Sequence, residues 1–309
     1  METHDEVEEF AKILQDPEID ITKRFRALFE LRGMFTLPAV KALINAFRLE
    51  PKSDLLKHEI CYCLGQMNNT EENTKTIEDF FEQVINEDHS SIVIHEAVEG
   101  YANLNPKNIY TLLEKFKDSN DQLVYETCEL ALDLKKWNEE TDVGKTENLD
   151  LTKLKYTTND PAPPFNPENN ENYKSVEWLK NLLLDPTKSI FERYRAMFTL
   201  REIATDEACE ALCQTLTKEN FEKSSALLKH EIGFVMGQLG QGFAHVCVPY
   251  LEEAVNNEDE APVVRHECVI ALGDITDKKT VMEKYSKDKN DIVRESCLVA
   301  LDMVDYWKE

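Results

Sequence analysis

The sequence predicts an all-α protein, an α-solenoid made of two duplicated halves with four helical hairpins in each half. RFRALFELR begins at Arg24 and returns as RYRAMFTLR at Arg193, and LLKHEI begins at Leu55 and returns at Leu227. Within each half, helical patterns recur in steps of about 30 to 37 residues, the period of helix–turn–helix repeats. Only nine glycines and few long β-branched runs occur, which argues against an all-β protein.

Each predicted hairpin ends in a segment with apolar residues at helical spacing, preceded by another helix-like stretch. In the first half these segments begin at Arg24, Lys57, Ile94 and Val124, and in the second half at Arg193, Lys229, Arg265 and Val293. The last hairpins also match, because EKFKDSNDQLVYETCELALDL from Glu114 returns as EKYSKDKNDIVRESCLVALDM from Glu283. The repeat pattern resembles the HEAT-like family.

The helical pattern stops between the halves. The stretch DPAPPFNPENNENY carries four prolines among polar residues and cannot continue a helix. We therefore predict an N-terminal arm over residues 1–137, a linker over 138–174 and a C-terminal arm over 175–309. The linker is long enough to let two rigid arms face each other, but a plain flexible connection fits the sequence equally well.

Composition limits the possible functions. A net charge of −25 excludes a general nucleic-acid binder, and it suits a cationic partner or simply a solvated acidic surface. No apolar run is long enough to span a bilayer, and the acidic N-terminus lacks the features of a signal peptide. Eight cysteines without CxxC spacing predict a reducing compartment and no disulfide framework. We expect a cytoplasmic monomer.

Four of the seven histidines are followed directly by glutamate, and all four occupy the same phase of their repeats. The pairs are His58-Glu59, His95-Glu96, His230-Glu231 and His266-Glu267. The same column in the outer repeats holds Phe25, Tyr125, Tyr194 and Arg294, so only the two central repeats of each half carry a pair. This pattern favours a special centre between capping repeats. The alternative is a polar seam along the superhelix.

The spacing of the pairs suits metal binding. Neighbouring helices in a stack lie about 8–10 Å apart, so imidazoles from adjacent helices can reach one ion. Each half offers two histidines and two glutamates, close to the 2-His-1-carboxylate set of oxygen-activating iron sites, and two facing halves would bring together two metals. Small residues stand seven positions after each histidine: Gly65, Ala102, Gly237 and Gly273. They indicate either close helix packing or room for metal and substrate.

Taken together, the duplicated repeats, the central His-Glu pairs, the DPAPP linker and LLKHEI-x4-GQ in both halves resemble the deoxyhypusine hydroxylase family over essentially the whole chain. The resemblance implies a monooxygenase with two Fe²⁺ ions that uses O₂ and an external reductant to hydroxylate the deoxyhypusine side chain of a eukaryotic translation initiation factor. It implies His58, His95 and Glu96 on one iron and His230, His266 and Glu267 on the other, with Glu59 and Glu231 as candidates for binding substrate amines or as additional ligands. Ala102 departs from the glycine usual in the family.

Three other interpretations stay open. A non-enzymatic HEAT-like scaffold would bind another protein without metal. A bilin lyase would use the same repeats but gives no reason for four His-Glu pairs. A hydrolase could hold zinc with the same ligands, because nitrogen and oxygen donors do not by themselves select iron.

Overall fold

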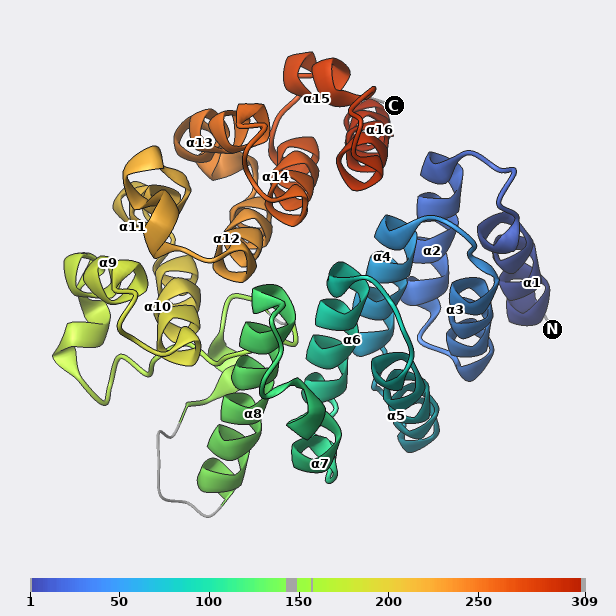
Figure 1. Ribbon diagram of the computed structural model, residues 1–309, viewed down its shortest axis with the longest axis horizontal. Coiled ribbons are helices and arrows are strands. Elements are labelled where there is room, and N and C mark those ends of the chain that lie inside the picture. The colour runs from blue at the N-terminus through green and yellow to red at the C-terminus, as the bar shows by residue number, and fades with distance from the viewer. Residues whose placement is uncertain (1, 143–148, 157, 307–309) are drawn as a thin grey trace. The chain divides into compact units, whose positions relative to one another are not determined.

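A computed structural model describes residues 2–142, 149–156 and 158–306 of the chain (Figure 1). The described residues form helices, turns and loops and contain no β-strand. The chain divides into two compact units, which we call unit 1 (Met1–Ala131) and unit 2 (Leu132–Glu309). The predicted all-α fold is confirmed.

Unit 1 is a stack of helical hairpins. The second helices of successive hairpins pack side by side, and the first helices form a layer behind them (Figure 1). The pairs are α1 (Glu2–Gln15) with α2 (Ile21–Met34), α3 (Leu37–Leu49) with α4 (Asp54–Gly65), α5 (Glu71–Asn86) with α6 (Ser91–Asn103), and α7 (Ile109–Leu113) with η1 (Glu114–Phe116) before α8 (Gln122–Asp142), which continues into unit 2.

Unit 2 repeats this plan, with α10, α12, α14 and α16 as the second helices. Its hairpins are α9 (Val176–Leu184) with α10 (Ile190–Ile203), α11 (Asp206–Cys213) and η4 (Gln214–Leu216) with α12 (Ala226–Leu239), α13 (Ala244–Asn256) with α14 (Pro262–Ile275), and α15 (Thr280–Tyr285) with α16 (Asp291–Tyr306). Short 3₁₀ turns are η2 (Leu151–Lys153), η3 (Glu171–Lys174), η5 (Lys218–Lys223) and η6 (Gln241–Phe243). The eight predicted hairpins are all present.

Matching serine caps begin the two helices that carry LLKHEI. Ser53 accepts a hydrogen bond from the Leu56 amide at 3.0 Å before α4, and Ser225 accepts one from Leu228 at 3.3 Å before α12. A side-chain oxygen at this position satisfies one of the amides that a helix N-terminus leaves unpaired. The caps fix the residues at which α4 and α12 begin, a few residues before each histidine.

Buried cations join consecutive repeats of unit 2. Lys229 on α12 contacts Glu260 at 2.7 Å, just before α14 begins. Arg265 on α14 contacts Asp288 at 2.8 Å, before α16, and also donates to the Val255 carbonyl at 3.0 Å. Each cation directly precedes a histidine of a His-Glu pair. The ion pairs therefore hold the backbone of the central repeats in register with the next hairpin.

Two of the small residues that follow the histidines, Gly65 and Gly273, lie at close contacts between helices. A Cβ atom on Gly65 would lie 2.9 Å from the Gly100 Cα of α6, and one on Gly273 would lie 3.0 Å from the Ala300 Cβ of α16. A Cβ on Gly237 would meet Ala271 at an ordinary 3.4 Å. Of the two predicted explanations, close packing is supported at Gly65 and Gly273. In α6 the glycine of the contact is Gly100, two residues before Ala102.

Residues 160–166 of the predicted linker are packed against the rest of unit 2. Residues 161–166 are buried against α10. Arg195 donates to the Pro163 carbonyl at 3.0 Å, and the Phe165 amide donates to Thr199 Oγ1 at 2.8 Å. Arg201 forms a buried ion pair with Asp160. A plain flexible connection is therefore wrong for this stretch, while the predicted limits of the two arms stay a prediction.

We expect Gly65→Ala to destabilise unit 1, because the Gly100 backbone cannot move away from the added methyl group. Overpacking of this kind costs about 1–3 kcal/mol, which exceeds the roughly 1 kcal/mol gained in helix propensity. Urea unfolding followed by circular dichroism measures the change. Gly33→Ala is the matched control, since nothing lies within 4 Å of its Cβ position, and it should stabilise slightly. Equal stabilisation by both changes would contradict the packing role of Gly65.

Asp288 should contribute to stability only above acidic pH. Burial raises the pKa of its carboxyl, but hydrogen bonds from the Asn290 amide and Arg265 outweigh burial and leave the pKa below the ordinary 3.8. The contribution is therefore present above the unfolded pKa and is lost as the pH falls through the folded pKa. The difference in unfolding free energy between wild type and Asp288→Asn should stay constant from about pH 7 to 5 and shrink below about pH 4. Asp79→Asn, at an exposed pair with Lys75, should show little difference at any pH.

Candidate metal site

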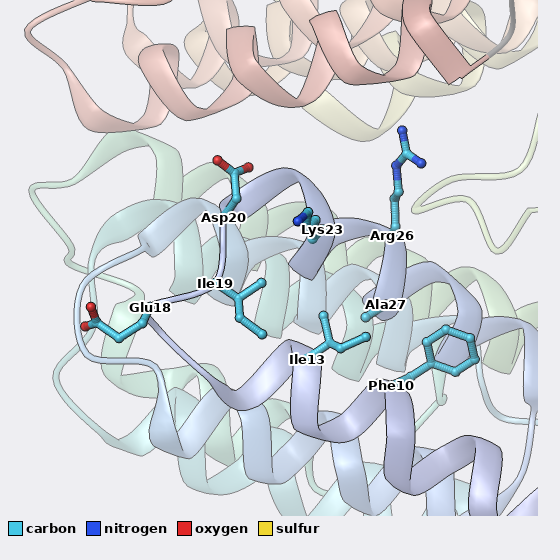
Figure 2. A pocket seen from close by; sticks show the side chains of 8 residues that line it. All are labelled: Phe10, Ile13, Glu18, Ile19, Asp20, Lys23, Arg26 and Ala27. Atoms are coloured by element: carbon cyan, nitrogen blue, oxygen red, sulfur yellow. The ribbon is translucent and has the colours of Figure 1, made fainter. Parts of the chain in front are cut away.

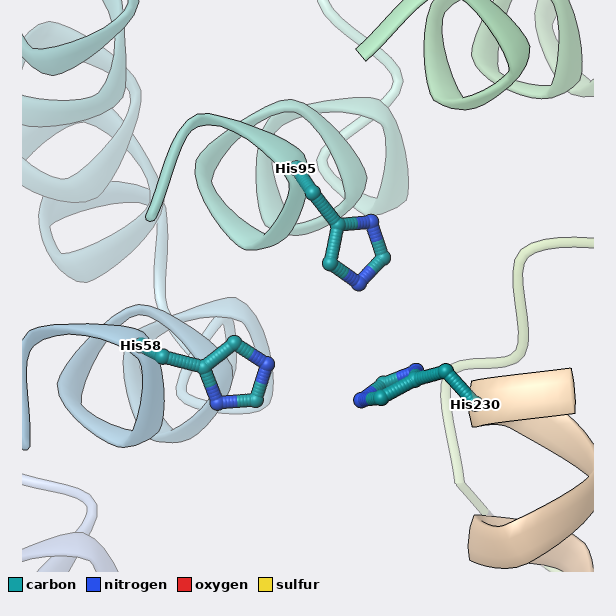
Figure 3. Close-up of side chains that lie close together, drawn as sticks. All are labelled: His58, His95 and His230. Atoms are coloured by element: carbon teal, nitrogen blue, oxygen red, sulfur yellow. The ribbon is translucent and has the colours of Figure 1, made fainter. Parts of the chain in front are cut away.

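In unit 1 the two histidines of the central repeats project to the same side from adjacent helices, His58 from α4 and His95 from α6 (Figure 3). Their ring centroids are 6.1 Å apart. Glu96 Oε2 lies between them, 3.2 Å from His58 Nε2 and 3.6 Å from His95 Nε2. All three side chains are buried. Two ring nitrogens and a carboxylate oxygen therefore meet at one buried point.

The carboxylates of this cluster favour a positive charge beside them. Burial lowers the pKa of His58, but Glu96 and Glu59 outweigh burial and raise it to about 10. Burial dominates at His95 and lowers its pKa to about 4, so that this ring is neutral near pH 7. Burial also raises the pKa of Glu96, yet His58 and His95 outweigh it and the carboxyl stays ionised. A buried carboxylate that forces a proton onto a neighbouring imidazole would equally stabilise a metal cation there.

Unit 2 builds the same cluster independently. His230 extends from α12 and is labelled in Figure 3. His266 and Glu267 lie on α14. Glu267 Oε2 is 3.5 Å from His230 Nε2 and 3.3 Å from His266 Nε2, and the ring centroids are 6.0 Å apart. One ligand atom from each of the three residues lies within 4.8 Å of the other two. The donors again are two imidazoles and one carboxylate, all buried.

Glu59 and Glu231 are also buried. Glu59 Oε1 lies 3.4 Å from Nδ1 of His58, the ring nitrogen other than the one that faces Glu96. Neighbouring residues on an α-helix diverge by about 100°, so both members of a His-Glu pair do not converge easily on one ion. The structure thus brings together three predicted residues in each unit, and in unit 1 Glu59 lies at the nitrogen of His58 that does not face Glu96.

Two further residues contact these clusters, and the sequence reasoning missed both. Thr127 on α8 lies 3.0 Å from His95 Nδ1, and Ser296 on α16 lies 2.8 Å from His266 Nδ1. A signal existed, because Thr127 and Ser296 occupy the same place in the duplicated segments ETCELAL and ESCLVAL. A hydroxyl on an outer repeat carries no metal-ligand pattern, however, so its partner is visible only in the folded chain.

Two other features of the described chain, a pocket and an exposed ion pair, lie away from these residues. A pocket of about 490 Å³ opens between α1 and α2, and its lining from Phe10 to Ala27 includes none of the His-Glu residues (Figure 2). His245 pairs with Asp206 on an exposed surface. The eight cysteines are buried free thiols, as predicted. No helix in the described ranges is both long and apolar enough to cross a membrane.

The geometry favours a metal site over the polar-seam interpretation. The His-Glu residues are buried and grouped around one point in each unit. A seam would leave them hydrated along the length of the stack. Buried imidazoles facing a buried carboxylate are instead typical of a site for a cation, since burial of such groups is costly unless charge compensates charge.

Comparisons with known proteins agree with the fold. A model of the PBS lyase HEAT-like repeat matches residues 192–218. Curated proteins named deoxyhypusine hydroxylase match almost the full length: one from Danio rerio is 41% identical over 95% of this chain and 90% of its own, and one from Mus musculus is 36% identical over 99% and 94%. One from Candida albicans is 39% identical over 93% and 87%. The solved structure of human deoxyhypusine hydroxylase in complex with glycerol is 36% identical, with a TM-score of 0.82, and covers 99% of this chain and 98% of that one.

Proposed function

Because the chain belongs to the deoxyhypusine hydroxylase family, we propose that it hydroxylates the deoxyhypusine side chain of a eukaryotic translation initiation factor and so completes hypusine formation. The observation that carries the proposal is the buried pair of His₂Glu clusters. The proposed enzyme is an O₂-dependent monooxygenase that acts as a monomer in the cytoplasm, with a protein substrate and without nucleic acid or membrane.

The nitrogen and oxygen donors of the two clusters are of the kind that binds iron. We propose that His58, His95 and Glu96 hold one Fe²⁺ and that His230, His266 and Glu267 hold a second, the two ions together forming a di-iron centre. Two imidazoles and one carboxylate for each ion leave coordination positions open, as in other oxygen-activating iron sites. Bound iron would supply the activation of O₂, with one oxygen atom entering the C–H bond and the other leaving as water at the expense of an external reductant.

The chain's own residues position the substrate in this proposal. Deoxyhypusine carries protonated amines. Glu59 and Glu231 are buried carboxylates that directly follow His58 and His230, and Glu59 lies at the His58 nitrogen that does not face Glu96. Charge-assisted hydrogen bonds from the amines would fix which carbon faces the metal. Burial of the clusters would keep bulk water from the bound metals, and the net charge of −25 would favour a basic protein segment as the substrate.

The other interpretations explain less of the structure. A protein-binding scaffold needs no buried convergence of ligands in both units. The bilin lyase interpretation rests on the repeat type alone, and the matching repeat model covers only residues 192–218. A zinc hydrolase would use the same donors, but full-length similarity joins the chain to proteins named as hydroxylases.

We expect the purified enzyme to hold about two irons per chain. His95→Ala removes one ligand of one cluster and should lower the content to about one, and the double change with His266→Ala should abolish it. Iron analysis and hydroxylation of a deoxyhypusine-containing factor measure the effect. His245→Ala, at an exposed ion pair, is the control and should keep both irons. Activity that persists in the double variant would refute the metal mechanism, and two zinc ions with no iron in active enzyme would refute iron.

Glu59→Ala should weaken substrate binding and leave the iron content unchanged. Loss of a hydrogen bond to a charged group costs about 1.5–3 kcal/mol, which corresponds to a roughly ten- to hundredfold weaker Kd. Titration of iron-loaded protein with the deoxyhypusine-containing substrate measures it, and Glu258→Ala, at an exposed position, is the control. If Glu59→Ala instead loses one of its two irons, and the iron of the other cluster stays bound with unchanged affinity, then Glu59 is a metal ligand.

A further inference from the structure

Each cluster contains one histidine whose Nδ1 contacts a buried hydroxyl of the next repeat. His95 meets Thr127 and His266 meets Ser296, at 3.0 and 2.8 Å. Both hydroxyl residues and both histidines are at most 1% exposed. The contacts join α6 to α8 in unit 1 and α14 to α16 in unit 2. The same arrangement has therefore been kept in both copies of the duplication.

The proton of each hydroxyl is already used. Thr127 Oγ1 donates to the Leu123 carbonyl at 2.7 Å, and Ser296 Oγ donates to the Ile292 carbonyl at 2.7 Å. A hydroxyl has a single proton, and a carbonyl oxygen can only accept. The hydroxyl oxygen must consequently accept a hydrogen bond from the ring, which requires the proton of the neutral imidazole to sit on Nδ1. The Nε2 atom then carries the lone pair.

That Nε2 atom is the one that faces the carboxylate. His95 Nε2 lies 3.6 Å from Glu96 Oε2, and His266 Nε2 lies 3.3 Å from Glu267 Oε2. With the proton on Nδ1, a nitrogen lone pair and a carboxylate oxygen face each other in a buried site. Such an arrangement disfavours the empty cluster and favours a cation that both atoms can bind. The other tautomer would place a proton where the metal has to sit.

We infer that Thr127 and Ser296 are positioning residues that hold His95 and His266 in the Nδ1-protonated tautomer and so direct Nε2 at the iron. The inference rests on the proposed function for the identity of the ion, but the tautomer itself is a property of the metal-free chain. Hydroxyl-to-carbonyl bonds four residues back are common in helices, so a purely structural role is the competing explanation.

The test compares Thr127→Val, which removes the hydroxyl at nearly constant shape, with Thr127→Ser, which restores it. Ser296→Ala and Ser296→Thr form the matching pair in unit 2. Thr215→Val is the control, because Thr215 is a buried residue that donates to the Leu212 carbonyl at 2.7 Å outside both clusters. Long-range ¹⁵N–¹H correlation spectra of the metal-free proteins report which nitrogen of each histidine is protonated. Anaerobic titration with Fe²⁺ alone then gives the affinity of each site.

In the wild type, His95 and His266 should both show protonated Nδ1. In Thr127→Val the His95 ring should lose this preference, and Fe²⁺ affinity at that site should fall about 10- to 100-fold, as for other losses of a hydrogen bond that orients a metal ligand. Thr127→Ser should restore both readouts, and Thr215→Val should change neither.

Two results would overturn the inference: protonated Nε2 in the wild type, or a Thr127→Val protein that keeps both the Nδ1 tautomer and wild-type affinity. A third combination separates the two claims. If Thr127→Val loses the Nδ1 preference but the wild-type protein binds no Fe²⁺, the tautomer assignment is upheld and the proposed function is overturned.

Discussion

In each unit, two imidazole rings and one carboxylate are buried around the same point, and the rest of the structure serves to hold them there. The arrangement is unfavourable by itself, because a buried carboxylate needs a positive charge nearby. In unit 1 this effect raises the pKa of His58 to about 10, because the charges of Glu96 and Glu59 outweigh the effect of burial. A solenoid can maintain such a cluster because the flanking repeats supply the packing energy that the cluster lacks.

Helix spacing decides whether the ligands meet. The glycine contact between α4 and α6 allows two backbones to approach closely at Gly65 and Gly100, one to two turns beyond the histidines. In unit 2 the buried ion pairs Lys229–Glu260 and Arg265–Asp288 hold α12 and α14 against the following hairpins. Small residues and ion pairs next to the His-Glu residues thus help to set a helix separation at which groups from two helices lie close enough for one metal ion.

The outer repeats contribute more than capping. The sequence column that holds histidine in the central repeats holds Tyr125 and Arg294 in the last repeats, which gives them no ligand. Two residues further along, Thr127 and Ser296 contact the ring nitrogens that face away from the carboxylates. Each cluster therefore draws on three successive helices, and its chemistry depends on the last hairpin of its unit as well as on the two central ones.

The sequence by itself determined the helical repeats, the duplication and the set of His-Glu residues, because each of these is a periodic pattern along the chain. It could not separate Glu96 from Glu59 by geometry, since adjacent residues differ only in their direction around the helix. Side-chain directions in the stacked helices show Glu96 between two rings and Glu59 at the other nitrogen of His58. It also left the proline-rich stretch and the hydroxyl contacts undecided. Those depend on residues about 30 to 40 positions apart, which only packing of the repeats brings together.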